Sequence, residues 1–312
     1  MSWVLDSASI EGHLSDGCAL TIGVYDGVHR GHHALLRHTV AWARAHGLPA
    51  VVLTFVPHPM AVLRPDQAPR MLCSLSHRVN RLLQLGIDVV VLQPFDDEFA
   101  QLSAEQFILR VLQDRLNAKA VVVGDDFRFG HQRTGTIETL RQASAFEVIS
   151  VPAVLDETGE RISSTRVRQW VAEGQVESAR QLLGEPFTWE GVVVQGERRG
   201  RELGYPTANL CALEPLLLPA PGVYACRAQL DDRIYPAAVS VGTPPMFPNA
   251  PGMVEAFLIG YEGEEFYGCP MTLQFLARLR PQQKFDSIDA LKAQMAQDVE
   301  RTLAVAEQTV AV

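Results

Sequence analysis

The chain has 312 residues, which is long for one compact domain and comfortable for two. Its formal net charge of −9 argues against non-specific binding to nucleic acid or to an anionic membrane surface. The five cysteines lack CxxC spacing, so we expect no disulfide framework and no zinc site, and the simplest location is a reducing cytoplasm. No signal peptide and no run long enough to span a membrane is expected.

The first half of the chain alternates apolar runs with amphipathic segments. Strands are predicted at 18–24, 49–55, 87–95, 118–124 and 146–154. Helices are predicted at 31–45, 75–86, 103–116 and 136–145, the third with Ser103 as its cap and Gln106 three residues later. Because such continuous apolar strands must be covered on both faces, the pattern predicts a parallel sheet in a Rossmann-like α/β domain.

A change of pattern follows two short predicted helices at 163–174 and 176–184. Beyond Gly184, short apolar runs alternate with clusters of Gly, Pro, Asp and Asn, which is typical of an antiparallel barrel or sandwich. The segment 287–306 predicts a long amphipathic helix packed on it. We therefore expect two domains, 1–184 and 185–312.

A histidine-rich stretch, GVYDGVHRGHHALL, occupies residues 23–36, where the first strand ends and the first helix begins. Free N–H groups and the helix dipole favour an anion there, and Gly27 and Gly31 let the backbone approach it closely. His29 and His32 can both point at one phosphate and stabilise the charge that develops when pyrophosphate leaves. Surface histidines in a loop are the simpler alternative, but the HxGH spacing at this junction favours phosphate binding.

A second candidate phosphate site is RISSTRVR, residues 161–168. Its hydroxyls could simply cap the helix that starts there, but three in a row exceed what capping needs. Arginine grips phosphate in a bidentate manner, and hydroxyls can donate alongside. The polar side chains concerned are Arg161, Ser163, Ser164, Thr165, Arg166 and Arg168.

HxGH followed by ISSTxxR resembles the nucleotidyltransferase superfamily. Three further stretches narrow the resemblance: LTFVPHP (53–59), VVVGDDFRFG (121–130) and RGRELGYPTANL (199–210). Together, and in this order along nearly the whole chain, they are similar to the bacterial bifunctional riboflavin kinase/FAD synthetase family. The resemblance implies an α/β nucleotidyltransferase domain followed by a β-barrel kinase domain with a C-terminal helix.

The resemblance implies that the first domain transfers AMP from ATP to FMN, giving FAD and pyrophosphate. His29 and His32 would take part in the transfer. The implied ATP-binding residues are Gly23, Asp26, His29, His32, Gly124, Asp125, Asp126, Arg161, Ser164, Thr165 and Arg168. The implied flavin-binding residues are Phe55, Pro57, His58, Pro59 and Phe127. For Phe55 and Phe127, core packing stays an equal alternative.

The resemblance implies that the second domain phosphorylates riboflavin. All nine histidines lie between His13 and His131, so the proton of the attacking alcohol must go to another group, and a carboxylate is the natural acceptor. In MVEAFLI, Glu255 shares a strand face with Phe257, and in the family this Glu is the base. A solubility charge on an edge strand is the alternative. The implied ATP and Mg²⁺ site is Gly200, Gly204, Pro206, Thr207 and Asn209, with Thr207 and Asn209 as the Mg²⁺ ligands.

Two departures from the family pattern concern the kinase half. TPPMF stands at 243–247 where a stretch close to TNPTF is common, and Gly260 stands where Asp is common. A monofunctional FAD synthetase with an impaired kinase half is therefore one alternative, and a flavin-binding regulator without catalysis is another. The expected partners are riboflavin, FMN and ATP, without nucleic acid or membrane, and the sequence leaves monomer or homo-oligomer open.

Overall fold

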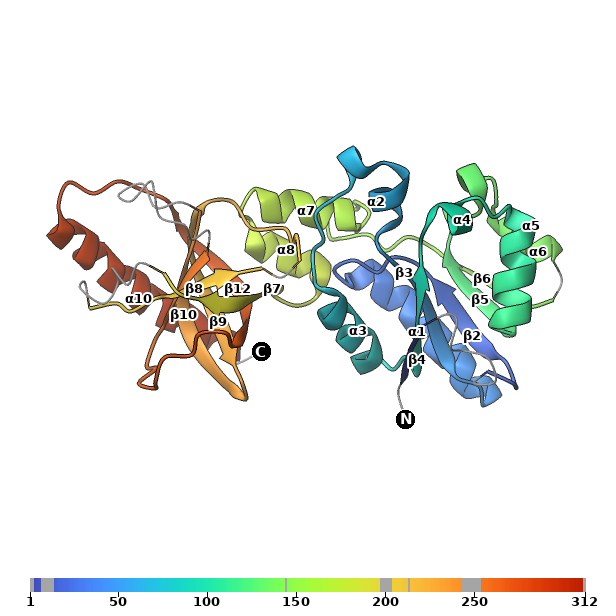
Figure 1. The fold of residues 1–312 in the computed structure, drawn as a ribbon, viewed down its shortest axis with the longest axis horizontal. Coiled ribbons are helices and arrows are strands. Elements are labelled where there is room, and N and C mark those ends of the chain that lie inside the picture. Colours follow the sequence, from blue (N-terminus) through green and yellow to red (C-terminus); the bar gives the residue numbers. More distant parts are fainter. Residues whose placement is uncertain are drawn as a thin grey trace. The chain divides into compact units, whose positions relative to one another are not determined.

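The computed structural model describes residues 3–6, 14–143, 145–196, 204–212, 214–242 and 254–310. The chain forms two compact units. The first comprises Met1–Pro69 and Leu75–Ser163, and the second comprises Arg70–Ser74 and Ser164–Val312. Each unit has its own sheet (Figure 1).

The sheet of the first unit has six strands in the order β1-β4-β3-β2-β5-β6. Every pairing in it is parallel, so the predicted parallel sheet is confirmed. The edge strand β1 was not predicted, because a four-residue strand leaves little pattern in the sequence. The strands are β1 (Trp3–Asp6), β2 (Cys18–Ile22), β3 (Ala50–Val56), β4 (Val89–Pro94), β5 (Ala118–Gly124) and β6 (Glu147–Val151).

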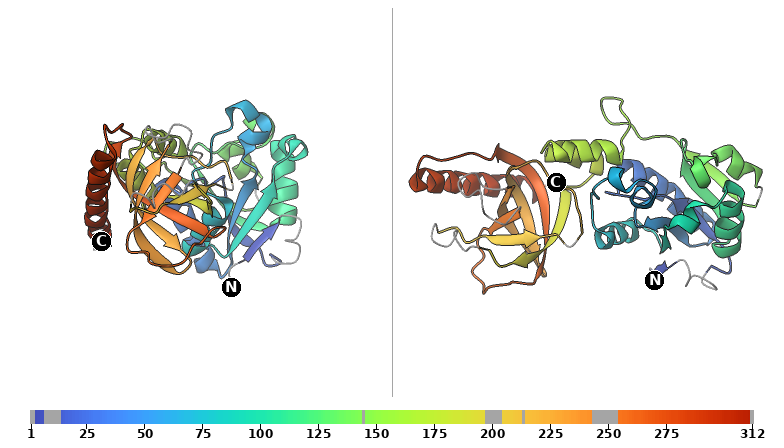
Figure 2. Two further views of the ribbon diagram at one scale, coloured as in Figure 1. Left: turned by 60° about the vertical axis from the view of Figure 1, so that its left-hand side comes forward. Right: turned by 45° about the horizontal axis from the view of Figure 1, so that its top comes forward.

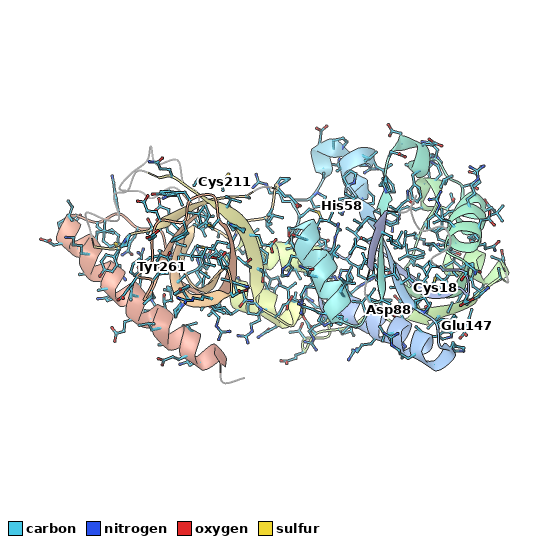
Figure 3. All side chains as sticks on the ribbon, turned by 60° about the horizontal axis from the view of Figure 1, so that its bottom comes forward. Cys18, His58, Asp88, Glu147, Cys211 and Tyr261 are labelled. Atoms are coloured by element: carbon cyan, nitrogen blue, oxygen red, sulfur yellow. The ribbon has the colours of Figure 1, made fainter. Side chains whose placement is uncertain are left out.

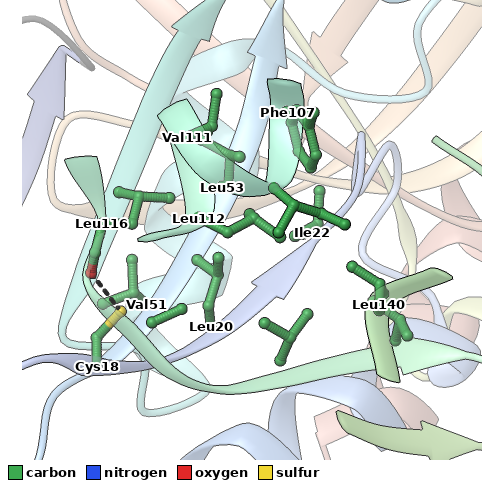
Figure 4. Close-up of a cluster of buried hydrophobic side chains, with 14 of the residues drawn as sticks. Cys18, Leu20, Ile22, Val51, Leu53, Phe107, Val111, Leu112, Leu116 and Leu140 are labelled. Carbon is green, nitrogen blue, oxygen red and sulfur yellow. Dashed lines mark hydrogen bonds between the residues drawn. The ribbon is translucent and has the colours of Figure 1, made fainter. Parts of the chain in front are cut away.

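Helices cover both faces of this sheet because its strands are apolar on both sides. On one face, Leu20 and Ile22 of β2 pack in one cluster with Phe107 and Leu112 (Figure 4). On the other face, Ala19 packs with side chains of α1 and α3. The first face is covered by α5 (Ala104–Gln106), the π-helix η3 (Phe107–Arg115) and α6 (Ile137–Gln142), and the second by α1 (Arg30–His46) and α3 (Leu75–Gln84).

The four predicted helices of this unit are confirmed, with ends that differ by a few residues. Ser103 and Gln106 form the predicted capping box at the start of α5. Short helical turns that the sequence did not predict are α2 (Pro59–Leu63), η2 (Pro65–Gln67), α4 (Asp97–Ala100) and η4 (His131–Arg133).

Burial raises the pKa of the Cys18 thiol to about 12, and this thiol donates to the carbonyl oxygen of Leu116 at 3.3 Å (Figure 4).

The second unit contains a closed barrel in the strand order β10-β11-β8-β7-β12-β9. All its pairings are antiparallel, so of the two predicted architectures the barrel is the one that forms. Its core includes the fully buried Trp189 and Phe275. The strands are β7 (Phe187–Val194), β8 (Ala208–Cys211), β9 (Gly222–Leu230), β10 (Arg233–Val241), β11 (Val254–Leu258) and β12 (Pro270–Pro281).

Helices α7 (Ser164–Ala172), α8 (Val176–Leu183) and α10 (Ile288–Val310) belong to the same unit. The predicted long helix is α10, which lies along the barrel and packs on β9, β10 and β12 (Figure 2). It is fastened by a buried ion pair between Arg280 and Asp298, whose Nη2 and Oδ2 are 2.8 Å apart. No helix in the described ranges is both long and apolar enough to cross a membrane.

Candidate active sites

Residues predicted to bind ATP and flavin follow three neighbouring strands of the parallel sheet. Gly23 follows β2, Phe55 lies near the end of β3, and Gly124 ends β5. Because parallel strands end at the same edge, their following segments meet there. The strand order runs outward from β2 and β5 in opposite directions, so this edge contains the switch point at which α/β sheets bind ligands.

The β2–α1 turn (residues 23–29) has a strained backbone. Tyr25 and Val28 both have positive φ, 55° and 38°, although neither is glycine, and both are buried. A β-branched residue in this region is a clear outlier. The Tyr25 hydroxyl lies 2.6 Å from Oγ1 of Thr21, and a Cβ at Gly23 would lie 3.1 Å from the Tyr25 ring. The turn is thus folded back on the end of β2, with Asp26 buried inside it.

The two predicted phosphate-binding histidines lie side by side at the start of α1. His29 is the N-cap of this helix, and its Nδ1 accepts a hydrogen bond from the backbone N–H of His32 at 3.3 Å. The two rings stack with centroids 3.6 Å apart. A Cβ at Gly31 would lie 3.0 Å from the His29 ring and 3.4 Å from the carbonyl oxygen of Ile162. The HxGH turn therefore packs closely on the beginning of the 161–168 segment.

The charge of His32 differs from that of an exposed histidine. Burial lowers the pKa of His32 well below its ordinary value of 6.5, and the positive neighbours His29, His33 and Arg78 lower it further. A neutral imidazole can still donate one hydrogen bond to an anion. His32 is therefore held neutral at pH 7, and what it has to offer an anion is a hydrogen bond and not a full positive charge.

Asp126 and Arg161, both predicted to bind nucleotide, form a bidentate ion pair. The nitrogen–oxygen distances are 2.5 Å and 2.9 Å. The hydrogen bonds from Arg161 lower the pKa of Asp126 and keep it ionised. Asp125, its neighbour, accepts from the backbone N–H of Ala153 at 3.4 Å through Oδ2.

Three other predicted phosphate ligands lie in the second unit, on α7. Ser164 is the first residue of that helix, and Thr165 follows it. Arg168 donates from Nε to the carbonyl oxygen of Arg70 at 3.1 Å. Their contact with a triphosphate stays a prediction.

The predicted flavin residues lie between the core and the surface. Phe55 and Phe127 are partly buried and pack against the main core cluster, so core packing describes part of what they do. His58, which is labelled in Figure 3, lies between Pro57 and Pro59 in the sequence. It caps α2 by accepting a hydrogen bond from the backbone N–H of Met60 at 3.0 Å.

A row of aromatic contacts joins Phe55 to Phe127. The sequence reasoning did not single out Phe95 and Phe99, whose rings lie 5.7 Å and 6.0 Å from that of Phe55. The row continues from Phe99 through Phe107 and Phe129 to Phe127, with ring centroids 5.5–6.1 Å apart. Both belong to the stretch FDDEF, which directly follows β4, and two phenylalanines at that position are the sequence pattern that could have pointed to them.

In the barrel, strand register places Glu255 beside Asn209. The two are direct partners across β11 and β8. Val254, Ala256 and Leu258 are buried whereas Glu255 and Phe257 are half-buried, so the predicted division of the strand into two faces is confirmed. Directly opposed residues share a face with Cβ atoms about 4.5–5.5 Å apart, so the carboxylate and the carboxamide are near neighbours.

Two contacts shape the surroundings of this pair. The ring of Tyr205, which precedes Pro206 and Thr207, meets the ring of Phe257 at 5.3 Å. A Cβ at Gly196 would overlap with Nδ2 of Asn209, so the carboxamide lies directly on the Gly196 backbone. The sequence did not point to Gly196, because its contact with Asn209 joins the segment after β7 to β8, and such a contact leaves no local pattern.

A cavity of about 550 Å³ opens at this part of the barrel, within the size range of small-molecule sites. It is lined by three predicted residues, Pro206, Thr207 and Asn209, and by Ala256 and Leu258 of β11. Glu255 lies on the other face of that strand and is not among the residues that line the cavity. Its aromatic lining is Tyr261, Phe266 and Tyr267, of which Tyr261 is labelled in Figure 3. The cavity thus combines polar side chains that carry oxygen atoms with an aromatic surface.

Several predicted features lie at or beyond the limits of the described residues. Gly200 and the TPPMF stretch at 243–247 lie outside them. Gly204 and Gly260 both have left-handed φ, 86° and 80°. Within the described ranges, no three His, Cys, Asp or Glu side chains are grouped so as to hold a metal ion.

The fold and the two sites define an enzyme that joins a nucleotidyltransferase-type α/β unit to a kinase-type barrel. A family model described as FAD synthetase matches residues 12–166, and one described as riboflavin kinase matches residues 183–306. The chain therefore belongs to the family of bifunctional riboflavin kinase/FMN adenylyltransferases.

Individual relatives agree with this assignment. The chain is 39% identical over 287 residues to the bifunctional riboflavin kinase/FMN adenylyltransferase of Escherichia coli strain K12, covering 91% of each chain. It is 32% identical over 290 residues to that of Bacillus subtilis strain 168, again covering 91% of each. A crystal structure described as a macrolide-efflux protein from Streptococcus pneumoniae has 35% identity and a TM-score of 0.86, covering 96% of this chain and 98% of that one. That description belongs to the other protein, and the match supports the fold here.

Proposed function

We propose that the chain makes FAD from riboflavin in two ATP-dependent steps, one in each of the two predicted domains, 1–184 and 185–312. The barrel unit phosphorylates riboflavin to FMN, and the α/β unit transfers AMP from a second ATP to FMN and releases pyrophosphate. The observation that carries this proposal is that the two family matches fall on two separate folds, each with its own candidate site. We propose Gly184 as the end of the adenylyltransferase domain and residue 185 as the start of the kinase domain, which assigns α7 and α8 to the first domain although they form a compact unit with the barrel.

For adenylyl transfer, the N-terminus of α1 and the stacked rings of His29 and His32 would hold the triphosphate. The support is the N-cap position of His29 and the contact of the turn with Ile162. Ser164, Thr165 and Arg168 would bind the β- and γ-phosphates, with Gly23, Asp26, Gly124, Asp125, Asp126 and Arg161 around the nucleotide. The attacking FMN phosphate is already anionic, so positioning and charge stabilisation carry the step without a strong base.

For the flavin of this step, the isoalloxazine ring would lie against Phe55 and Phe127, with Pro57, His58 and Pro59 beside it. The support is the row of aromatic contacts between the two phenylalanines, because aromatic faces favour stacking of a flat ring. Phe99, which belongs to that row, would pack behind the ring of Phe55 and support it.

For riboflavin phosphorylation, Glu255 would accept the proton of the attacking primary alcohol. The new bond forms between that oxygen and the γ-phosphorus, and the bond from the γ-phosphorus to the bridging oxygen breaks, so ADP leaves with its charge. The support is the position of Glu255, half-buried on the same strand face as Phe257 and opposite Asn209. The cavity lined by Pro206 and Thr207 would admit the nucleotide. Gly200, outside the described residues, and Gly204 stay proposed ATP-binding residues.

Magnesium fits the donor set that the barrel offers. The side chains of Thr207 and Asn209 supply neutral oxygens at the cavity, and Mg²⁺ takes a few protein oxygens and leaves the rest to phosphates and water. When bound, the ion would neutralise phosphate charge. We also propose a cytoplasmic location, which is supported by an odd number of scattered cysteines without CxxC spacing.

The test is to incubate the full chain with riboflavin, ATP and Mg²⁺ and to follow FMN and FAD by chromatography. We expect riboflavin to be converted first to FMN and then to FAD, with pyrophosphate released in the second step. Turnover of FMN without turnover of riboflavin would instead identify a monofunctional FAD synthetase. Tight flavin binding without pyrophosphate release would identify a regulator.

A further inference from the structure

Arg78 is a buried cation that no sequence motif singled out. It lies on α3, and only 4% of its surface is exposed. A guanidinium is costly to bury, so a buried one that contacts a candidate active site calls for a reason.

One contact of Arg78 is with the β2–α1 turn. Its Nη1 donates to the carbonyl oxygen of Val24 at 2.7 Å. The same oxygen accepts a second hydrogen bond, at 3.1 Å, from Oγ1 of the buried Thr54 on β3. The carbonyl is thus held from a helix and from a strand that lie far from it in sequence.

The held carbonyl stands directly before the strained part of the turn. Tyr25, Gly27 and Val28 have φ of 55°, 75° and 38°. Such conformations persist only where the surroundings over-determine them, and they cluster at functional sites. Without the hydrogen bonds to Val24, the turn could relax toward ordinary backbone angles and rotate the start of α1.

Arg78 also lies within electrostatic reach of His32, whose ring touches that of Tyr25 with centroids 5.0 Å apart. A fixed positive charge behind the turn adds to the potential that attracts an anion at the helix N-terminus. One residue therefore fixes the shape of the turn and contributes to its potential.

We propose that Arg78 is a positioning residue for adenylyl transfer, which holds the Val24 carbonyl so that the N-terminus of α1, His29 and His32 are preorganised for the triphosphate. This inference rests on the proposed function of that site. Arg78 acts through the turn, not by touching the substrate.

The test compares Arg78→Met, which keeps the length of the side chain and removes its donors, with Arg78→Lys, which keeps a donor and the charge. In the full chain, we expect Arg78→Met to lower kcat/KM for FMN adenylylation about 10- to 100-fold, the range of small misplacements of reacting groups. Riboflavin phosphorylation by the same preparation should be unchanged, which reports a folded barrel. Arg78→Lys should restore part of the lost rate.

A second readout does not depend on activity. We expect NMR titration of His32 to show a higher pKa in Arg78→Met than in the wild type, and a wild-type-like value in Arg78→Lys. Thr54→Val removes the other donor to the same oxygen, so its effect on adenylylation should be non-additive with that of Arg78→Met. Unchanged adenylylation together with an unchanged His32 titration in Arg78→Met would overturn the inference.

Failure of the proposed function is distinguishable from failure of this inference. If the wild type does not adenylylate FMN, the proposed function of the unit is wrong, and the His32 titration still reports whether Arg78 sets the state of the turn. If Arg78→Met unfolds the α/β unit, Thr54→Val alone provides the test. In that case normal adenylylation by Thr54→Val would contradict the role given to the Val24 carbonyl.

Discussion

The two candidate sites are held in place by different means. In the α/β unit the histidines proposed to bind phosphate lie at the end of an irregular turn in which Tyr25, Gly27 and Val28 are left-handed. In the barrel, Glu255 and Asn209 lie on regular strands, and their pairing follows from the antiparallel register. A strained turn depends on a few specific contacts, whereas a strand position is shared by a whole ladder of hydrogen bonds. Backbone changes should therefore harm the first site most, and side-chain changes the second.

The largest expected effect is at Glu255, the proposed general base of the barrel. Glu255→Gln keeps the size and polarity of the side chain and removes its basicity, so riboflavin phosphorylation should fall about 10²- to 10⁴-fold, the usual contribution of a general base. FMN adenylylation should stay at the wild-type rate. Chromatography of FMN and FAD from separate assays with riboflavin and with FMN measures both activities.

The controls for this prediction come from both units. Glu262→Gln changes an exposed carboxylate of the same unit and should leave both activities unchanged. His32→Ala should give the reverse pattern, with adenylylation lost and phosphorylation retained. Equal loss of both activities in a folded Glu255→Gln protein would mean that the sites are not independent.

The next effect concerns Gly196, which lines the same cavity as Asn209. In Gly196→Ala the new methyl group would collide with the Asn209 carboxamide, because a Cβ at this position overlaps with Nδ2. Displacement of this proposed Mg²⁺ ligand should lower the rate of riboflavin phosphorylation up to about 10²-fold and raise the Mg²⁺ concentration that the reaction needs. Rates measured over a range of Mg²⁺ concentrations provide the check.

The matching background is Asn209→Ala, which removes the side chain that the methyl group would strike. If Gly196 acts only through Asn209, adding Gly196→Ala to Asn209→Ala should cost no further activity. A full additional loss in the double variant would show that Gly196 serves the loop itself.

A smaller effect is expected from the backbone of the turn. Gly27 has φ of 75°, so Gly27→Ala places a side chain in the left-handed region at a cost of about 1–2 kcal/mol. We expect FMN adenylylation to fall about tenfold, because small shifts of the groups at the start of α1 misplace the triphosphate. Riboflavin phosphorylation should be unaffected in the same assay.

Gly159→Ala is the matched control in the same unit. Gly159 has φ of 82°, and a Cβ there would meet no atom within 4 Å. It should lose a similar amount of stability in thermal unfolding and keep its adenylylation rate. Equal loss of activity in the two variants would make the effect one of general stability, not of the turn.

The sequence predicted those features of the fold that a local residue pattern determines, namely strands and their faces. The apolar runs located five strands of the parallel sheet, and the alternation in MVEAFLI separated the two faces of β11. It missed β8, because this short strand lies inside a stretch with the composition of a loop. It also missed Arg78, Phe99 and Gly196, whose importance comes from contacts between segments far apart in the chain, as in the bond from Arg78 to Val24.

The smallest expected effect is a difference between the two units in how their stability depends on pH. The pKa of His32 is lowered in the folded state from 6.5, first by burial, and that of His33 is lowered as well. The unfolded chain therefore binds more protons as the pH falls below about 6.5, and the stability of the α/β unit should decrease on acidification by at most about 1.4 kcal/mol per pH unit for each histidine. Residues 164–312 contain no histidine, so the barrel unit has no such contribution.

Hydrogen exchange of the full chain, followed by segment between about pH 5 and pH 7 and corrected for intrinsic rates, measures this difference. Protection of β2 and α1 should fall toward the acid end, whereas that of β9 and β10 should change less. His32→Gln, which cannot take up a proton, should reduce the slope for β2 and α1 and leave that for the barrel strands as it was. An equal slope in wild type and variant would mean that His32 is not held neutral by its burial, and the turn would then present a full charge to the phosphate.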